Sequence, residues 1–174
     1  MKRLYVWDPL VRLFHWSLVL AFLANAFVTR PGKEVHQWVG YGVAALIALR
    51  LVWGLIGPRH ARFSDFLPSP SGAIAQLREM ATGRREAHAG HSPLGALMIY
   101  NLLLTMAAIA LTGWMQTTVA YFGVEWVAQV HEALVTWAEL CALAHVAAVV
   151  LESRRLRVNL PKSMVTGYKE FVQE

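Results

Sequence analysis

The chain has 174 residues, of which 56% are hydrophobic and only 16% are charged, and its formal net charge is +5. Soluble domains carry about 25% charged residues, so this composition excludes an ordinary water-soluble domain and indicates an integral membrane protein. Its single cysteine, Cys141, excludes an intramolecular disulfide and every CxxC motif.

Four apolar stretches are long enough for helices that cross a bilayer, which need about 20 residues. They are Val11–Val28, His36–Ile56, Leu94–Met115 and Val130–Leu151. We therefore predict an all-α, four-helix membrane bundle built as a single domain of residues 1–174. The first stretch follows Met-Lys-Arg, as in a signal peptide, but His15 and Asn25 interrupt it and no small-residue cleavage site closes it. We interpret it as a membrane helix.

The lysines and arginines predict how these helices are oriented. Most flank the apolar stretches on one side of the predicted bundle: Lys2, Arg3, Arg12, Arg59, Arg62, Arg78, Arg84, Arg85, Arg154, Arg155, Arg157, Lys162 and Lys169. The other side has only Arg30 and Lys33. Because basic residues concentrate on the cytoplasmic side of membrane proteins, both termini and the linker 57–93 are expected in the cytoplasm. This placement explains the net charge without nucleic-acid binding.

The two longer connections have different characters. In the linker, Ser71 is the expected N-cap of a short helix through Ala73–Thr82, with Ile74 and Leu77 on one face. Such a helix would lie at the membrane interface. The outer loop, 116–129, is expected to lie along the outer surface through its aromatic residues. These are Tyr121, Phe122 and Trp126.

Seven histidines are candidates for chemistry: His15, His36, His60, His88, His91, His131 and His145. Four of them lie within or at the ends of the predicted spans, where ligating side chains are costly and usually functional. His131 and His145 are 14 residues apart. In a helix this interval corresponds to about 21 Å along the axis and about 40° around it. One helix face therefore presents an imidazole near each membrane surface.

Depth in the membrane pairs these four histidines. His36 and His131 are expected near the outer surface, and His15 and His145 near the inner surface. A four-helix bundle can place each pair on facing helices, with two imidazole nitrogens on opposite sides of a haem iron. Zinc would prefer four protein ligands close together. Any one of these histidines could instead be a hydrogen-bonded core residue, but four at matched depths favour haem, held by coordination and packing alone.

Small residues and one arginine support this interpretation. Gly40 and Gly42 follow His36 by about one and two helical turns, and Gly113 lies at the same outer depth. Glycine would let a macrocycle approach the backbone, although ordinary close packing of helices is an equal alternative. Arg50 is expected at the inner depth, where it could pair with haem propionates. The alternative is an arginine that snorkels to the cytoplasmic surface.

The remaining histidines, His60, His88 and His91, lie in the polar linker and are expected at the surface. His91 directly precedes the third apolar stretch. It is the best placed of the three to act as a spare ligand or proton donor.

Several stretches carry a family resemblance. They are VWDPLVRLFHW (6–16), HQWVGYGVAALIALRLVWGLIGPRHARFSDF (36–66), HSPLGALMIYNLLLTMAAIALTG (91–113), VHEALVTWAELCALAHVAAVV (130–150) and NLPKSMVTG (159–167). Together they cover most of the chain. They resemble the bacterial cytochrome b561 family, which lies within the broader group of cytochrome b subunits of hydrogenases and formate dehydrogenases.

The resemblance implies a di-haem b-type cytochrome of the bacterial inner membrane that takes part in respiratory electron transport. It implies exchange of electrons with quinone and with a redox partner, such as a c-type cytochrome or a dehydrogenase subunit. By analogy, the quinone would bind near His15, Arg50 and the linker. Whether the chain is itself an enzyme stays open.

Three alternatives remain. The first is a superoxide oxidase that delivers electrons to ubiquinone, which would need a cationic guide on the outer face. The second is the cytochrome b anchor subunit of a multi-subunit dehydrogenase, although such anchors often carry a further helix. The third is a helical anchor without redox activity, in which the histidines are structural.

Overall fold

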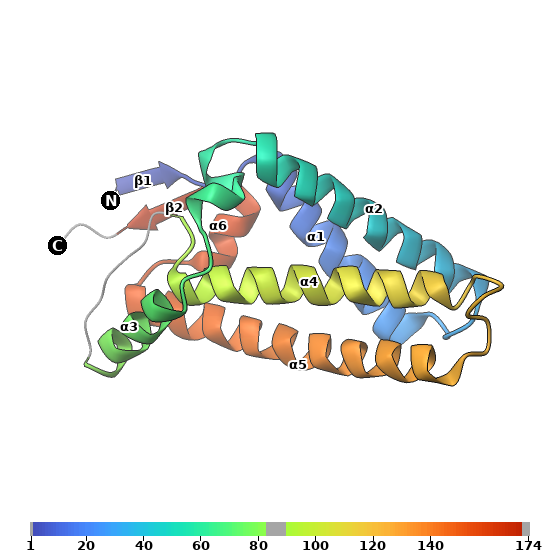
Figure 1. Ribbon diagram of the computed structural model, residues 1–174. Helices are drawn as coiled ribbons and strands as arrows, with labels where there is room; N and C mark the ends of the chain where they lie inside the picture. The colour runs from blue at the N-terminus through green and yellow to red at the C-terminus, as the bar shows by residue number, and fades with distance from the viewer. Residues whose placement is uncertain (1, 83–89, 172–174) are drawn as a thin grey trace. The chain divides into compact units, whose positions relative to one another are not determined.

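Four long apolar helices dominate the computed structural model, which describes residues 2–82 and 90–171 (Figure 1). They are α1 (Pro9–Leu23), α2 (Glu34–Ile56), α4 (Pro93–Met115) and α5 (Glu125–Leu156). A π-helical turn, Ala24–Val28, continues α1. All four are long and apolar enough to cross a membrane, so the chain is a multi-pass membrane protein and the predicted spans are confirmed.

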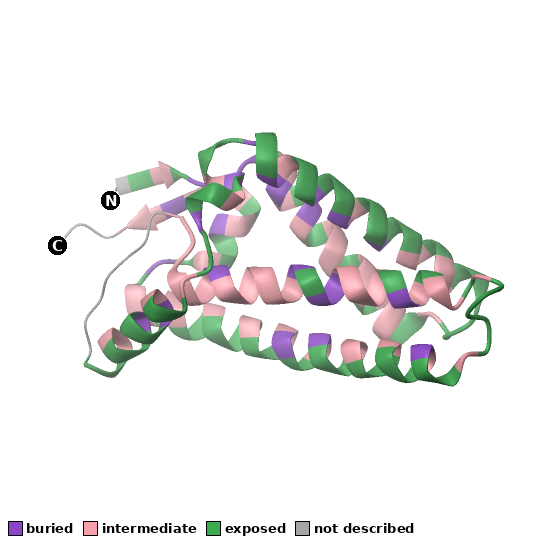
Figure 2. Ribbon diagram, viewed as in Figure 1, coloured by how far each residue is buried: buried purple, intermediate pink, exposed green. Residues whose placement is uncertain are grey.

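Many residues along the helices are exposed, as the green parts of the ribbon in Figure 2 show. Many of these residues have large apolar side chains. On α1 the exposed residues recur every three or four positions: Leu13, Trp16, Leu20 and Leu23. This spacing forms one stripe along the helix, and in a bilayer such a stripe faces lipid. At about 100° per residue, His15 lies about 120° around the helix from the stripe. The sequence of α1 therefore separates a lipid face from the face that carries the histidine.

Contacts divide the chain into two compact units. Unit 1 comprises Met1–Arg12, Val52–Tyr100 and Leu143–Glu174, whereas unit 2 comprises Leu13–Leu51 and Asn101–Ala142. Each long helix contributes residues to both units. The organisation as a single domain stays a prediction.

In unit 1 the two ends of the chain pair as a short antiparallel ribbon that the all-α prediction did not include. Strand β1 (Lys2–Tyr5) pairs with β2 (Tyr168–Phe171), with Lys2 opposite Phe171 and Tyr5 opposite Tyr168. The rings of Tyr5 and Tyr168 lie 5.0 Å apart. Helix α6 (Leu160–Thr166) leads into β2. The ribbon is short, so the fold remains all-α in character.

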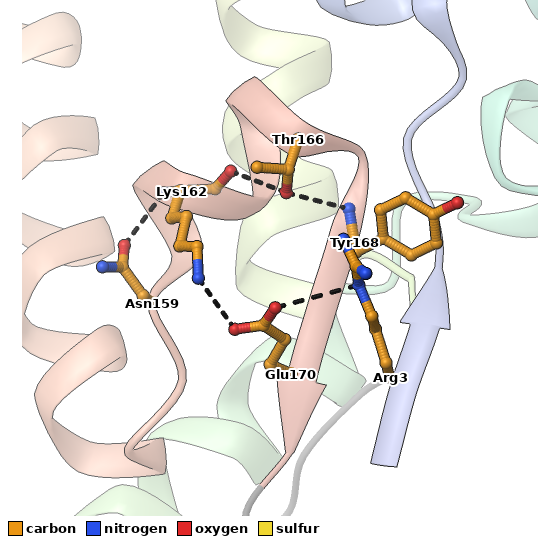
Figure 3. Close-up of polar contacts among 6 residues, drawn as sticks. All are labelled: Arg3, Asn159, Lys162, Thr166, Tyr168 and Glu170. Atoms are coloured by element: carbon orange, nitrogen blue, oxygen red, sulfur yellow. Dashed lines mark hydrogen bonds and ion pairs between the residues drawn. The ribbon is translucent and has the colours of Figure 1, made fainter. Parts of the chain in front are cut away.

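Charged side chains tie the ribbon to α6 (Figure 3). Glu170 lies 3.0 Å from the Lys162 ammonium and 3.8 Å from Nε of Arg3. The hydrogen bond from Lys162 and the nearby positive charges lower the pKa of the Glu170 carboxyl. The side chain of Asn159 caps α6 by accepting a hydrogen bond from the backbone N–H of Lys162 at 2.9 Å.

Two residues of the ribbon region are anchored more deeply. Lys169 is 6% exposed, and its ammonium donates to the Gly90 carbonyl at 2.6 Å. Burial lowers the pKa of Lys169 to about 8. The indole N–H of Trp7 donates to the Ser163 hydroxyl at 3.1 Å. These contacts join the N-terminal segment, the end of the linker and the C-terminal segment within unit 1.

The linker contains α3 (Pro70–Ala81), which is one residue shorter at its end than the predicted helix. Its N-cap is Ser69, whose hydroxyl accepts a hydrogen bond from the Gly72 N–H at 3.1 Å, so the expected cap at Ser71 is wrong. The reason is Pro70, which fits the first helical position and keeps the preceding residue extended. Ile74 and Leu77 are both exposed, as the predicted apolar face requires.

Candidate cofactor site

His36 is held at the junction between α1 and α2. The π-helical turn closes with a 2.8 Å bond from the Thr29 N–H to the Ala24 carbonyl. This turn brings the Thr29 hydroxyl to 3.0 Å from Nδ1 of His36. Asn25 supports both residues, because its amide donates to the His36 carbonyl at 3.1 Å and its carbonyl oxygen accepts from Thr29 at 2.9 Å. π-Helical turns often occur at functional sites.

His131 is held in the same way by α4. Its Nδ1 lies 2.9 Å from the hydroxyl of Thr112, a residue that is 7% exposed. The next residue, Gly113, lies against the imidazole, since a Cβ there would be 3.2 Å from Cε1 of His131. That contact is tighter than an ordinary van der Waals approach, so a side chain at this position would displace the ring.

The structure brings His36 and His131 together within unit 2, close enough to interact electrostatically. Both are half-buried, and each uses Nδ1 to contact a threonine hydroxyl. Metal-ligating histidines commonly hydrogen-bond through one ring nitrogen and coordinate through the other. Two imidazoles with free Nε2 positions fit the axial ligand set of a b haem.

Among residues 2–82 and 90–171, no group of three or more His, Cys, Asp or Glu side chains could hold a metal ion. A haem iron needs fewer protein ligands than a bare metal ion, because the macrocycle supplies four ligands and two imidazoles are sufficient to complete the set. The pairwise arrangement of the histidines is therefore the relevant geometry.

The two histidines of the second predicted pair, His15 and His145, lie on different helices. His15 is half-buried on α1, with its ring edge-on to Trp16 at 5.1 Å between centroids. His145 is half-buried on α5, on the same helix as His131. His15 belongs to unit 2 and His145 to unit 1, so their pairing stays a prediction.

Arg50 lies on α2 and is only 4% exposed. A snorkelling arginine would hold its guanidinium in the interface, so this burial favours the inward orientation that its spacing from His36 predicts. A buried guanidinium in a membrane helix requires anionic or polar partners. Its pairing with haem propionates stays a prediction.

Two of the glycines on α2, Gly40 and Gly42, have room around them. A Cβ on Gly40 would meet only the amide nitrogen of Asn25, at 4.0 Å, and a Cβ on Gly42 would meet nothing within 4 Å. Close packing between helices therefore does not explain the absence of a side chain at Gly40. A role for Gly40 beside a macrocycle stays a prediction.

The linker histidines differ from one another. His60 bonds Asp65 at 2.9 Å, and Arg59 bonds the same carboxylate at 3.2 Å. Partial burial raises the Asp65 pKa, but these two partners outweigh it and the net pKa is lowered. His60 is thus part of a local ion-pair cluster.

His91 packs against two aromatic rings, 4.7 Å from Trp7 and 4.1 Å from Phe66 between centroids. It is half-buried, so the expected surface position is wrong. The reason is that the N-terminal segment and the linker fold over it within unit 1. His88 lies outside the described residues.

The sequence interpretation missed the polar residues that hold His36 and His131. Asn25 was visible as an interruption of the first apolar stretch, and Thr112 stands beside the glycine that was singled out. Polar residues inside an apolar span, close to a candidate ligand, were the available signal. Thr29 had no such signal, because only the π-helical turn brings it to His36.

The family profile of prokaryotic cytochrome b561 matches residues 6–167. The chain belongs to this family. A relative, the probable Ni/Fe-hydrogenase B-type cytochrome subunit of Cupriavidus necator, is 26% identical over 98% of this chain and 88% of its own length. No solved structure matches the chain. As a prokaryotic cytochrome b561, the chain is a membrane electron-transfer protein, and its family implies haem b.

Proposed function

We propose that the chain binds two b haems and carries electrons across the bacterial inner membrane, between the quinone pool and a redox partner. His36 and His131 would ligate one haem, and His15 and His145 the other. Each haem supplies an iron that alternates between the ferric and ferrous states inside an apolar span. The observation that supports the proposal is that His36 and His131, both in unit 2, each contact a threonine hydroxyl through Nδ1.

The chain's own residues would set the positions of the two cofactors. Helix α5 carries His131 and His145 about 21 Å apart along its axis, so it would hold the two irons at different depths. The buried guanidinium of Arg50 would supply a cation for haem propionates at the inner depth. If two histidines hold each haem, donors and acceptors would exchange electrons with the haem without binding to its iron.

The proposed orientation places both termini and the linker in the cytoplasm, because basic residues concentrate there. The His15–His145 pair would then lie near the cytoplasmic surface. A quinone would bind beside this pair, close to Arg50 and the linker.

Haem content and its response to single substitutions test the proposal. The purified protein should give close to two b haems per chain in a pyridine haemochrome assay. His145→Ala and His131→Ala should each remove one haem, and a different one. The matched control is Val146→Ala, which changes an exposed neighbour of His145 on the same helix. A native protein without b haem would refute the function, and retention of both haems in either histidine variant would refute the ligand assignment.

A more specific role is membrane subunit of a multi-subunit dehydrogenase. The relative from Cupriavidus necator, which is named as a hydrogenase cytochrome subunit, aligns along nearly the whole of both chains. If this role holds, gentle solubilisation from native membranes should retain a peripheral redox subunit, and that subunit's substrate should reduce the haems. Haem reduction by quinol alone, with no copurifying subunit, would exclude this role. The chain would then act as an electron carrier without a dehydrogenase subunit.

A further inference from the structure

Three hydrogen bonds around His36 form a closed ring. The ring runs from the His36 imidazole to Thr29 at 3.0 Å, from Thr29 to Asn25 at 2.9 Å, and from Asn25 to the His36 backbone carbonyl at 3.1 Å. All of the contributing residues belong to unit 2. The direction of each bond can be derived, because one of the groups can only accept.

The His36 carbonyl fixes the direction of the ring. A carbonyl oxygen cannot donate, so the Asn25 atom that faces it is the amide nitrogen. The Asn25 carbonyl oxygen therefore faces Thr29 and must receive the hydroxyl proton. A hydroxyl has one proton, so Thr29 can only accept from Nδ1 of His36. His36 consequently carries its proton on Nδ1 and leaves Nε2 with a lone pair.

The threonine beside His131 also uses its hydroxyl proton elsewhere, with different partners. The Thr112 hydroxyl donates back to the carbonyls of Ala108, at 2.8 Å, and Ile109, at 3.1 Å. Threonines in helices commonly use their proton in this way. The Thr112 hydroxyl oxygen can therefore only accept a hydrogen bond from Nδ1 of His131, at 2.9 Å. His131 thus adopts the same tautomer as His36, although the two threonines lie on different elements.

The opposite tautomer is disfavoured in both places. If Nδ1 accepted the threonine proton, the hydroxyl oxygen would face a carbonyl oxygen at 2.8–2.9 Å with no hydrogen between them. Such an acceptor–acceptor contact in a half-buried site loses a hydrogen bond and adds repulsion. Two independent networks therefore select Nε2 as the ligating nitrogen.

We propose that Thr29 and Thr112 are matched positioning residues, which fix His36 and His131 with Nε2 available for iron and raise the donor strength of both imidazoles. This inference rests on the proposed function. A hydrogen bond from Nδ1–H to an oxygen makes an imidazole a stronger donor, which stabilises ferric over ferrous iron. Asn25 extends the effect at His36, because its bond polarises the Thr29 hydroxyl.

The test is redox titration of the purified di-haem protein with Thr29→Val and Thr112→Val. Valine keeps the shape of threonine and removes the hydroxyl. Each variant should raise the reduction potential of one haem, the one that His131→Ala removes, and leave the other haem unchanged. Retention of that haem against an apo-protein acceptor should weaken by about 10-fold or more. The double valine variant should show the larger shift.

Serine variants and a matched threonine separate the hydroxyl's role from packing. Thr29→Ser and Thr112→Ser keep the hydroxyl and should keep the native potential. Thr105→Val changes another buried threonine two turns earlier on α4 and should leave both potentials unchanged. If Thr112→Val loses its haem entirely, Thr112→Ser must retain it. Loss of that haem in the serine variant as well would overturn the proposal.

The outcomes distinguish this proposal from the proposed function. Native protein with two haems, and valine variants whose two potentials are both unmoved, would overturn the positioning role alone. Native protein without b haem would refute the function itself.

Discussion

Glycine at position 113 determines how closely α4 and the His131 ring can approach. The imidazole already lies where a side chain would begin, 3.2 Å from an added Cβ. The neighbouring Thr112 bonds the same ring, so the two residues together specify both the distance and the rotation of the imidazole.

Gly113→Ala should displace the His131 ring by a few tenths of an ångström and stretch its bond to Thr112. We expect this variant to weaken the haem that His131 ligates and to shift that haem's potential, while the other haem is unaffected. Visible spectra and redox titration of purified protein would show it. Leu111→Ala, at an exposed position on the same helix, is the control. Native behaviour of Gly113→Ala would contradict the close contact.

Gly40→Ala tests the macrocycle directly. The protein alone has room for the methyl group, whose nearest neighbour would be 4.0 Å away. Alanine also favours a helix over glycine by about 1 kcal/mol, so a protein without haem at this position should become more stable. If a macrocycle packs on Gly40, haem content should fall instead. Haem content per chain, compared with that of the unsubstituted protein, distinguishes the two results.

Residue type and spacing in the sequence predicted which histidines are candidate ligands. They did not predict which residues hydrogen-bond to those histidines. The 14-residue interval on one helix is visible in the sequence. The contact between Thr29 and His36 depends on a π-helical turn and a short connection, which apolar periodicity does not encode. The burial of Arg50 is consistent with the inward orientation that its spacing from His36 predicts. The burial of His91 was not predicted, because the residues that pack against it, such as Trp7, are distant in the sequence.

Helix α1 begins at a well-defined cap. Oδ1 of Asp8 accepts from the N–H groups of Leu10 and Val11 at 3.0 and 3.2 Å, and from the Trp53 indole at 3.1 Å. Pro9 occupies the first helical position, where its missing N–H costs nothing. The sequence Asp-Pro therefore starts the helix and, within unit 1, ties it to the end of α2.

Asp8→Ala should destabilise the protein by about 0.5–2 kcal/mol through loss of the cap. Asp8→Asn keeps an acceptor oxygen in the same place and should retain most of the stability. Thermal unfolding in detergent would measure both. Equal losses in the two variants would mean that the charge, and not the accepted hydrogen bonds, supports this helix start.

The β1–β2 ribbon should depend on pH through Glu170. Its carboxyl pKa is lowered by Lys162 and then by Arg3, so the folded ribbon favours the charged form. The resulting stabilisation is present above the ordinary glutamate pKa and is lost as pH falls through the lowered value. NMR shifts of the neighbouring Tyr5 and Tyr168 rings should report the loosening. Glu170→Gln should abolish the pH dependence, and high salt should weaken it, because the pair is exposed.

Elements dominated by local apolar content were predicted well, and those that depend on distant partners were not. Helix α5 runs from Glu125 to Leu156, beyond both ends of the predicted span, because a helix continues into polar sequence after it leaves the apolar region. Strands β1 and β2 have mixed composition, and each forms only by pairing with the other, although almost the whole chain separates them in sequence. No local window contains that information.

For the whole molecule, the arrangement of basic residues predicts one orientation in the membrane. The single native cysteine makes this testable, since Cys141→Ala leaves a background without thiols. In intact cells, a membrane-impermeant maleimide should label Val119→Cys, a fully exposed position between α4 and α5. Leu67→Cys, an exposed linker position, should react only after the membrane is opened. The reverse labelling pattern would invert the proposed topology.

The pairing of the first strand with the last also constrains biosynthesis. β1 precedes all four long helices in the sequence, but its partner β2 is made only after residue 167. All four hydrophobic segments are therefore synthesised before β1 has a partner strand. Pairing of β1 with β2 is therefore a late step in folding. A chain truncated before Tyr168 would insert its helices but could not form the ribbon.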